Sequence, residues 1–271
     1  MNSDRPMSHN KYSCGFEEIY SKDYNLWKSV IAEFFGSMLL NIFAGATFSQ
    51  GEDIIFKAFS NGLGIYIVNV IIGKLSGGHV NPSVTVTMLL SRRITFTRAL
   101  FYVIIQCCGS TIGVFAIKHL LDDTYHYGLH NFELAENVSI IQGLAMEFLL
   151  GFSLLLTVFA AYDINNRNTH CANCLAIGLC VTLGHLCFGR YTGAGLNPAN
   201  VLASALVAGN WNFHWIYWIG PIFGGIMAAI IYVQILETSL QLTKPLDAAD
   251  KYRLHVIERE MSKKDSNKNY A

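Results

Sequence analysis

The sequence predicts an all-α membrane protein: a bundle of six transmembrane helices plus two re-entrant half-helices, arranged as an inverted 3+3 repeat. Three observations support this fold class. The 271 residues are 52% hydrophobic and only 14% charged, with a mean hydropathy of +0.34, which is unusual for a soluble protein. Apolar runs long enough to cross a bilayer recur along the chain, and an Asn-Pro motif occurs at corresponding places in its two halves.

Six apolar runs match the length of a membrane-spanning helix. The hydrocarbon core of a bilayer is about 30 Å thick, which takes roughly 20 helical residues. We predict spans at 27–48, 54–74, 95–118, 140–162, 172–189 and 214–236. Two further apolar segments, 81–90 and 197–208, are too short to cross, and each follows a Gly-rich turn. These short segments are the predicted half-helices.

Polar residues dominate both ends of the chain. We therefore divide the sequence into an N-terminal tail, a membrane domain with two repeat halves, and a C-terminal tail. The predicted bounds are 1–26, 27–238 (halves at about 27–119 and 140–236) and 239–271.

The distribution of charge indicates how the spans are oriented. Cytoplasmic loops retain Lys and Arg, and these residues collect after the second span, after the fourth span and in the C-terminal tail. The opposite loops carry acidic residues, and one holds the sequon Asn137-Val138-Ser139. We predict cytoplasmic N- and C-termini in a multi-pass protein, with the plasma membrane as the expected location. Asn137, close to the membrane boundary, is a candidate glycosylation site.

The two halves of the chain resemble each other. A shared Glu-Phe pair begins at Glu33 and at Glu147, 76–83 matches 192–199, and 102–109 matches 217–224, at offsets of 114, 116 and 115 residues. With three spans in each half, the two copies must cross the membrane in opposite directions. In inverted repeats of this kind the interrupted helices mark the transport site.

Each Asn-Pro motif has the pattern of a helix start. Asn is a favoured N-cap and Pro is favoured at the first helical position. The motifs are Asn81-Pro82-Ser83 and Asn197-Pro198-Ala199. The half-helices should meet N-terminus to N-terminus near the midplane, where their dipoles oppose cations and the two Asn amides can donate to one passing oxygen.

Charge and cysteine usage exclude several other function classes. The net charge is zero, which argues against a nucleic-acid partner. Cys171 and Cys174, beside His170, have metal-ligand spacing, but no second pair completes a zinc site. The sequence shows no nucleophile, general base and orienting group at a spacing typical of a catalytic site. We expect no metal, no cofactor and no enzymatic activity.

Together these motifs resemble the aquaporin, or major intrinsic protein, family over about 27–238. Further matching segments are Ala32-Glu33-Phe34, Gln106, Gly184-His185-Leu186 and His214-Trp215-Ile216-Tyr217-Trp218. The resemblance implies a right-handed bundle in the lipid bilayer, one pore per subunit and a homotetramer. It also implies that backbone carbonyls line the pore, here those of Gly77, Gly78, His79, Gly193, Ala194 and Gly195.

Glu33 and Glu147 are charged residues inside apolar spans, where ionisable groups are costly and usually functional. One interpretation makes them proton carriers of a coupled transporter. The family resemblance implies another, in which they accept hydrogen bonds from the re-entrant loops and hold the half-helices in place. We favour loop anchoring, because the two residues are repeat mates rather than members of a relay.

The resemblance also implies a second constriction on the extracellular side. The matching positions are Asn61, His185, Ala194 and Asn200. His185 fits the water-selective pattern of the family. Asn200 replaces the usual arginine and Asn61 often a bulky aromatic, so the site should be wider and should lack one barrier to cations.

The implied function is a passive channel that conducts water, with small neutral solutes as further candidates. Val201, Ala205 and the pair Tyr217-Trp218 fit the water branch of the family rather than the glycerol branch. Two alternatives stay open. The missing arginine favours a channel for glycerol, urea or hydrogen peroxide, and the buried glutamates leave a proton-coupled secondary transporter to be tested.

Overall fold

The computed structural model describes residues 14–21, 24–48, 53–121, 132–163, 166 and 168–236. Within these ranges the chain forms helices and turns without a strand. The helices are α1 (Leu26–Phe48), α2 (Ile54–Ser76), α3 (Pro82–Leu90), α4 (Phe96–Leu120), α5 (Ile140–Ala161), α6 (His170–Thr192), α7 (Pro198–Ala208) and α8 (Ile216–Ile231). A 3-10 turn, η1 (Phe16–Ile19), precedes α1, and a π-helical turn, η4 (Tyr232–Leu236), continues α8. The predicted C-terminal tail and most of the N-terminal tail lie outside the described residues.

Six of these helices are long and apolar enough to cross a membrane. They confirm the predicted spans, with ends that differ by a few residues. One such difference is in α6, predicted at 172–189 and observed at His170–Thr192. The Thr169 side chain caps its start, and Gly193 ends it with a φ of 79°. Capping groups determine where the helix begins and ends. A prediction from the length of an apolar run does not take them into account, so its bounds differ.

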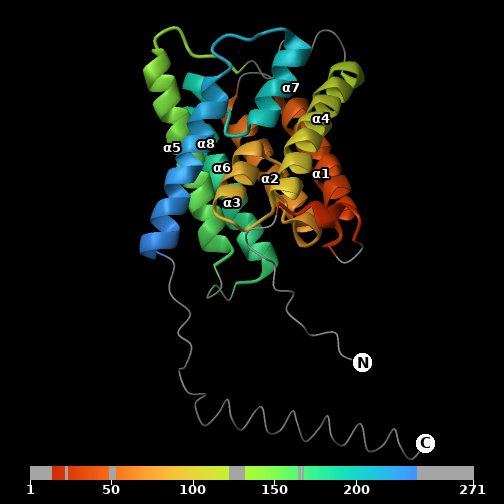
Figure 1. Ribbon diagram of the computed structural model, residues 1–271. Helices are drawn as coiled ribbons and strands as arrows, with labels where there is room; N and C mark the ends of the chain where they lie inside the picture. Colours follow the sequence, from red (N-terminus) through yellow and green to blue (C-terminus); the bar gives the residue numbers. More distant parts are fainter. Residues whose placement is uncertain are drawn as a thin grey trace, which may run out of the picture. The chain divides into compact units, whose positions relative to one another are not determined.

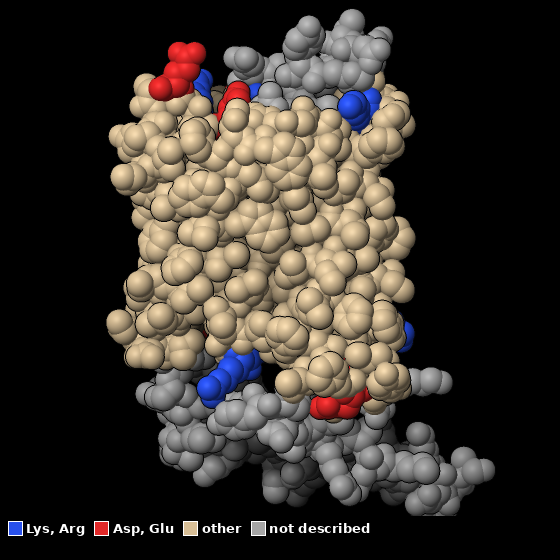
Figure 2. Space-filling model, turned by 45° about the horizontal axis from the view of Figure 1, so that its top comes forward, with Lys and Arg blue, Asp and Glu red and all other residues tan. Residues whose placement is uncertain are grey.

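The outside of the bundle is apolar over its middle. Phe35, Leu100, Ile141 and Leu183 are among many large hydrophobic side chains that are exposed on it. Figure 2 shows the charged side chains of the described residues gathered toward the two ends, with an uncharged belt between them on the face in view. A lipid bilayer solvates such a belt, so the chain is an integral, multi-pass membrane protein.

The two halves of the chain pack in the same way, as the repeat predicts. α1 packs against α4, and α5 packs against α8. A Cβ at Gly109 of α4 would collide with the carbonyl oxygen of Phe34, and a Cβ at Gly224 of α8 with that of Phe148. Small residues let helix backbones approach closely in membranes. Figure 1 shows the consequence for the short helices: α3 and α7 extend from opposite ends of the bundle toward its middle.

Candidate functional site

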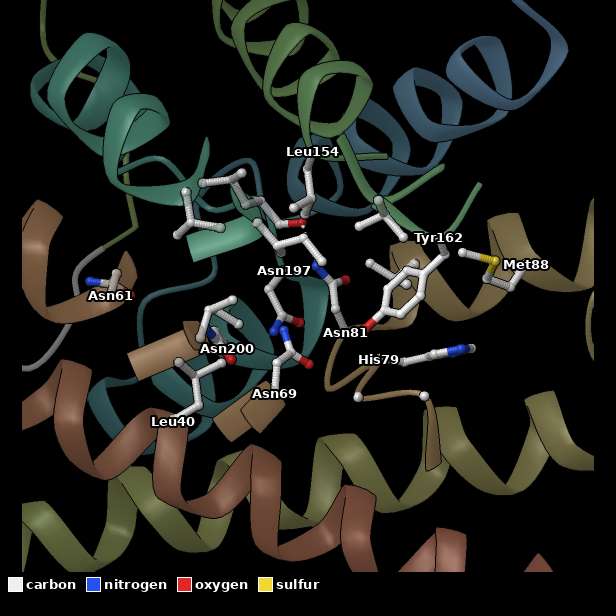
Figure 3. Close-up of a pocket in the computed structure, with 18 of the residues that line it drawn as sticks. Leu40, Asn61, Asn69, His79, Asn81, Met88, Leu154, Tyr162, Asn197 and Asn200 are labelled. Carbon is white, nitrogen blue, oxygen red and sulfur yellow. Dashed lines mark hydrogen bonds between the residues drawn. The ribbon is translucent and has the colours of Figure 1, made fainter. Parts of the chain in front are cut away.

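A cavity of about 200 Å³ runs along the junction of α3 and α7, with room for several water molecules. Its walls come from the long helices, chiefly α2, α5 and α6, and from the loops that precede α3 and α7. In Figure 3 the labelled residues follow one another from Asn61, past Asn200, to Asn81 and Asn197, and then to His79 and Tyr162. The junction therefore lies midway along the cavity.

Asn81 and Asn197 begin the two half-helices. The side-chain oxygen of Asn81 accepts a hydrogen bond from the Ser83 N–H at 2.8 Å, and that of Asn197 accepts one from the Ala199 N–H at 3.0 Å. A proline follows at the first helical position of each, Pro82 and Pro198. The Ser83 hydroxyl adds a bond of 2.8 Å to the Asn81 oxygen, which Ala199 cannot make.

The same two side chains join the half-helices to each other. Asn81 Nδ2 donates to the carbonyl of Leu196 at 3.1 Å, and Asn197 Nδ2 donates to the carbonyl of Val80 at 2.7 Å. A carboxamide has two N–H donors, so one on each side chain is left over. Because both residues line the cavity, these remaining N–H groups can donate to an oxygen inside it.

Val80 and Leu196 have an unusual backbone conformation, with φ of 41° and 49°. Positive φ is uncommon outside glycine and is an outlier for a β-branched residue. Strained backbone of this kind persists only where its surroundings hold it. Here each residue is held from both sides: its carbonyl accepts from the Asn of the opposite half, and its N–H donates to a buried glutamate, Glu33 at 2.6 Å for Val80 and Glu147 at 3.0 Å for Leu196.

Glu33 accepts three further hydrogen bonds around the first loop. Its Oε1 accepts from the Ser76 hydroxyl at 2.6 Å and the His79 N–H at 2.9 Å, and its Oε2 accepts from Gln106 Nε2 at 2.8 Å. Glu33 has no exposed surface and does not line the cavity. Both carboxylate oxygens are thus occupied by the loop and its neighbours.

Glu147 has the corresponding role in the geometry of the second loop. Its Oε1 accepts from the Thr192 hydroxyl at 2.7 Å and from the Gly195 N–H at 2.8 Å. Like Glu33, it has no exposed surface and does not line the cavity. The repeat extends one step further, because Tyr217 donates to the Thr192 carbonyl at 2.8 Å, as Tyr102 does to that of Ser76.

Three of the four residues predicted for the outer constriction line the cavity. They are Asn61, His185 and Asn200. Ala194, the fourth, has no exposed surface and is not among the lining residues. The structure therefore brings three polar side chains to this end of the cavity, and Ala194 is fully buried.

Backbone carbonyls fix which atoms of this end face the cavity. Asn61 Nδ2 donates to the Lys57 carbonyl at 2.9 Å, which leaves its Oδ1 without a partner among the described residues. His185 Nδ1 lies 3.0 Å from the Val181 carbonyl, which can only accept, so Nδ1 carries the hydrogen and Nε2 is an acceptor in the neutral ring. Asn61 and His185 thus offer acceptors.

The remaining predicted site residues divide into two groups. Gly77, Gly78, His79 and Gly195 line the cavity, whereas Gly193 is absent from its lining. Asn137 lies in an exposed turn before α5 and is not among the lining residues.

Sequence reasoning missed several residues of the site. Asn69 of α2 lines the cavity, and Asn41 of α1 lies behind it, bonded to Asn200. The sequence held a signal for both, since a carboxamide inside an apolar span is costly and usually functional. Arg93, which lies over the Phe159 ring at 5.1 Å, also lines the cavity, although its loop position resembled that of a surface charge.

The fold and this junction define a class: integral membrane proteins built as inverted repeats with two facing half-helices. A family model described as major intrinsic protein matches residues 20–232. The chain belongs to the major intrinsic protein family.

Sequence and structure comparisons agree with this membership. The chain is 33% identical to aquaporin-4 of Bos taurus over 89% of this chain and 80% of that protein. It is 36% identical to aquaporin-1 of Homo sapiens over 78% and 82% of the two chains. A solved structure, the aquaglyceroporin from Plasmodium falciparum, has a TM-score of 0.69 at 22% identity, over 78% of this chain and 96% of that one. At 22% identity, the similarity to this solved structure shows a shared fold alone.

Proposed function

We propose that this protein is a passive membrane channel that conducts water down an osmotic gradient through the cavity at the α3–α7 junction. Aquaporins at 33% to 37% identity support water as the substrate. The observation that carries the proposal is the pair of carboxamides at the junction. Asn81 and Asn197 each keep one N–H for the cavity while two helix N-termini face the same point, so a passing molecule meets donors and positive potential. A water held there presents its oxygen, which interrupts a proton-conducting chain.

In this proposal Glu33 and Glu147 anchor the loops and do not carry protons. Both carboxylates accept from loop N–H groups, and neither lines the cavity. A proton carrier needs access to the transported solution. The transporter alternative predicts uptake against a gradient that a protonophore abolishes, whereas the channel gives flux that only follows the gradient.

A second candidate is a channel for glycerol, urea or hydrogen peroxide. The observation in its favour is the outer end of the cavity, where Asn200 stands in place of a fixed cation and Asn61 in place of a bulky ring. Together with His185, these side chains offer uncharged donors and acceptors that suit hydroxyl-bearing solutes. The fold shared with an aquaglyceroporin leaves this candidate open.

Paired flux measurements separate the two candidates. Purified protein in liposomes is subjected to an osmotic step, and water and glycerol permeabilities are measured by light scattering, with empty liposomes as the control. If liposomes that contain the protein shrink no faster than empty liposomes, the assignment of water as the substrate is wrong. In a solute channel, Asn200→Arg should lower glycerol permeability by roughly tenfold, equivalent to ~1.4 kcal/mol of barrier, and leave water flux largely intact.

We further propose that the channel is a homotetramer in the plasma membrane with cytoplasmic N- and C-termini. The exposed apolar belt supplies surface for neighbouring subunits as well as lipid. Asn137, in its exposed turn, would then face the outside, where glycosylation of the sequon is sterically open. Cross-linking in native membranes and protease protection of tagged termini test the assembly and the orientation.

A further inference from the structure

The inverted repeat supplies an internal comparison for the outer end of the cavity. The 116-residue offset between Asn81 and Asn197 places Val84 opposite Asn200, and the 114-residue offset between Glu33 and Glu147 places Leu155 opposite Asn41. Val84 and Leu155 belong to one apolar core cluster. The fold therefore accepts apolar residues at these positions, and the pair of asparagines in the other half needs a separate explanation.

The two asparagines are joined by a buried hydrogen bond between α1 and α7. Asn41 Nδ2 donates to Asn200 Oδ1 at 2.9 Å and to the backbone carbonyl of Ser37 at 2.9 Å. Asn41 and Asn200 are only 1% and 6% exposed. Both N–H groups of Asn41 are thus engaged by acceptors, deep within the bundle.

This bond fixes which end of the Asn200 carboxamide faces the cavity. The Ser37 carbonyl can only accept, so Nδ2 of Asn41 must be the atom turned toward it. The same Nδ2 meets Asn200, whose oxygen must therefore be the atom that points to α1. Nδ2 of Asn200 is left without a protein partner among the described residues, on a side chain that lines the cavity (Figure 3).

The Asn41–Asn200 pair lowers the stability of the fold, which indicates that the pair has a functional role. Asn41 Oδ1 is buried and has no hydrogen-bond partner among the described residues. An unpartnered buried acceptor is destabilising, and a leucine such as Leu155 would avoid it.

We propose that Asn41 is a positioning residue that sets solute selectivity, by holding the Asn200 carboxamide with its NH₂ group in the cavity. The outer end then presents one fixed neutral donor opposite the acceptors of His185 and Asn61. One water molecule can accept from the Asn200 NH₂ group and donate to the acceptors of His185 and Asn61. A polyol carries several hydroxyl groups, so it needs a side chain that can turn to donate to some of them and accept from others. The inference rests on the proposed channel function and deepens it.

The test replaces Asn41 in the full-length chain and measures the ratio of glycerol to water permeability in liposomes. Once the permeability of empty liposomes is subtracted from each value, this ratio does not depend on how much protein is incorporated. In Asn41→Leu the carboxamide of Asn200 is free to turn, and we expect the ratio to rise by about fivefold, the equivalent of one hydrogen bond. Asn41→Val, which is smaller, is the second variant for the same test.

Two comparisons distinguish positioning from a general structural effect. In an Asn200→Ala background, Asn41→Leu should leave the ratio unchanged, because the group that it positions is gone. The matched control is Ser37→Ala, which removes a buried hydroxyl without a partner on the same helix and should leave the wild-type ratio. An unchanged ratio in Asn41→Leu and Asn41→Val, or an equal rise in the Asn200→Ala background, would overturn the inference alone. A wild type that conducts neither solute would overturn the channel proposal as well.

Discussion

The side chain of Asn197 donates to the backbone carbonyl of Val80 over 2.7 Å, between residues that are 117 positions apart in the sequence. The reciprocal bond, from Asn81 to Leu196, closes the junction from the other side. Each asparagine therefore caps its own half-helix and also ties it to the opposite loop.

Replacing Asn197 with alanine removes both its cap and its cross-link. We expect Asn197→Ala to lower the free energy of unfolding by about 2–4 kcal/mol, the sum of a lost cap and a lost buried hydrogen bond. Thermal unfolding in detergent, followed by tryptophan fluorescence, measures the loss. Asn137→Ala, in an exposed turn, is the control and should unfold like the wild type. A variant of Asn197 with wild-type stability would contradict a structural role for the cross-link.

Replacing Glu147 with glutamine keeps its size but not its acceptor capacity. The carboxylate accepts from Thr192, Gly195 and Leu196, and a carboxamide NH₂ would face at least one of these donors. We expect Glu147→Gln to destabilise the protein by roughly 1–3 kcal/mol and to reduce water flux, as the strained Leu196 backbone loses its hold. The same unfolding and liposome assays apply. Flux that still follows the gradient would agree with anchoring, and lost coupling to a proton gradient would argue for the transporter.

The ion pair between Glu18 and Arg98 fastens the N-terminal segment to α4. Their oxygen and nitrogen lie 2.7 Å apart, and the two side chains are 2% and 16% exposed. Glu18→Gln leaves the partly buried Arg98 without its counter-ion, so we expect it to cost about 1–3 kcal/mol. The double variant Glu18→Gln/Arg98→Gln should cost less than the two single variants added together. Additive losses would show that the pair is not energetically coupled.

Glycine is required where α1 and α4 cross. An alanine at Gly109 would overlap the Phe34 carbonyl oxygen, which belongs to the backbone and cannot rotate away. We expect Gly109→Ala to lower the unfolding free energy by about 1–3 kcal/mol or more, as the helices are forced apart. Gly45→Ala is the matched control, since its nearest contacts would be 3.4 Å or longer. Equal melting temperatures for the two variants would argue against this close crossing.

The sequence predicted the features that depend on period, length and local chemistry. Apolar runs located the spans, and the Asn-Pro motifs located the starts of α3 and α7, because capping is a property of a few adjacent residues. The repeat predicted that Glu33 and Glu147 would occupy matching places. What the sequence could not predict are bonds between distant segments. Asn41 and Asn200 are 159 positions apart, and nothing local to either shows that they meet.

Ala194 and its neighbour Gly195 differ in exposure. Counting from Asn197 predicts Ala194 in the constriction, which stays a prediction; Ala194 has no exposed surface, whereas Gly195 lines the cavity. The loop turns sharply here, with φ of 52° at Ala194, so that adjacent residues face in different directions. A count along the chain cannot follow such a turn.

The reciprocal bonds across the junction set the order of events during biosynthesis. A chain that emerges from the ribosome completes α1 to α4 before α7 exists, and until then the Val80 carbonyl has no Asn197 to bind. The junction can close only when both halves of the chain are present, because the group that holds the Val80 carbonyl belongs to residue 197.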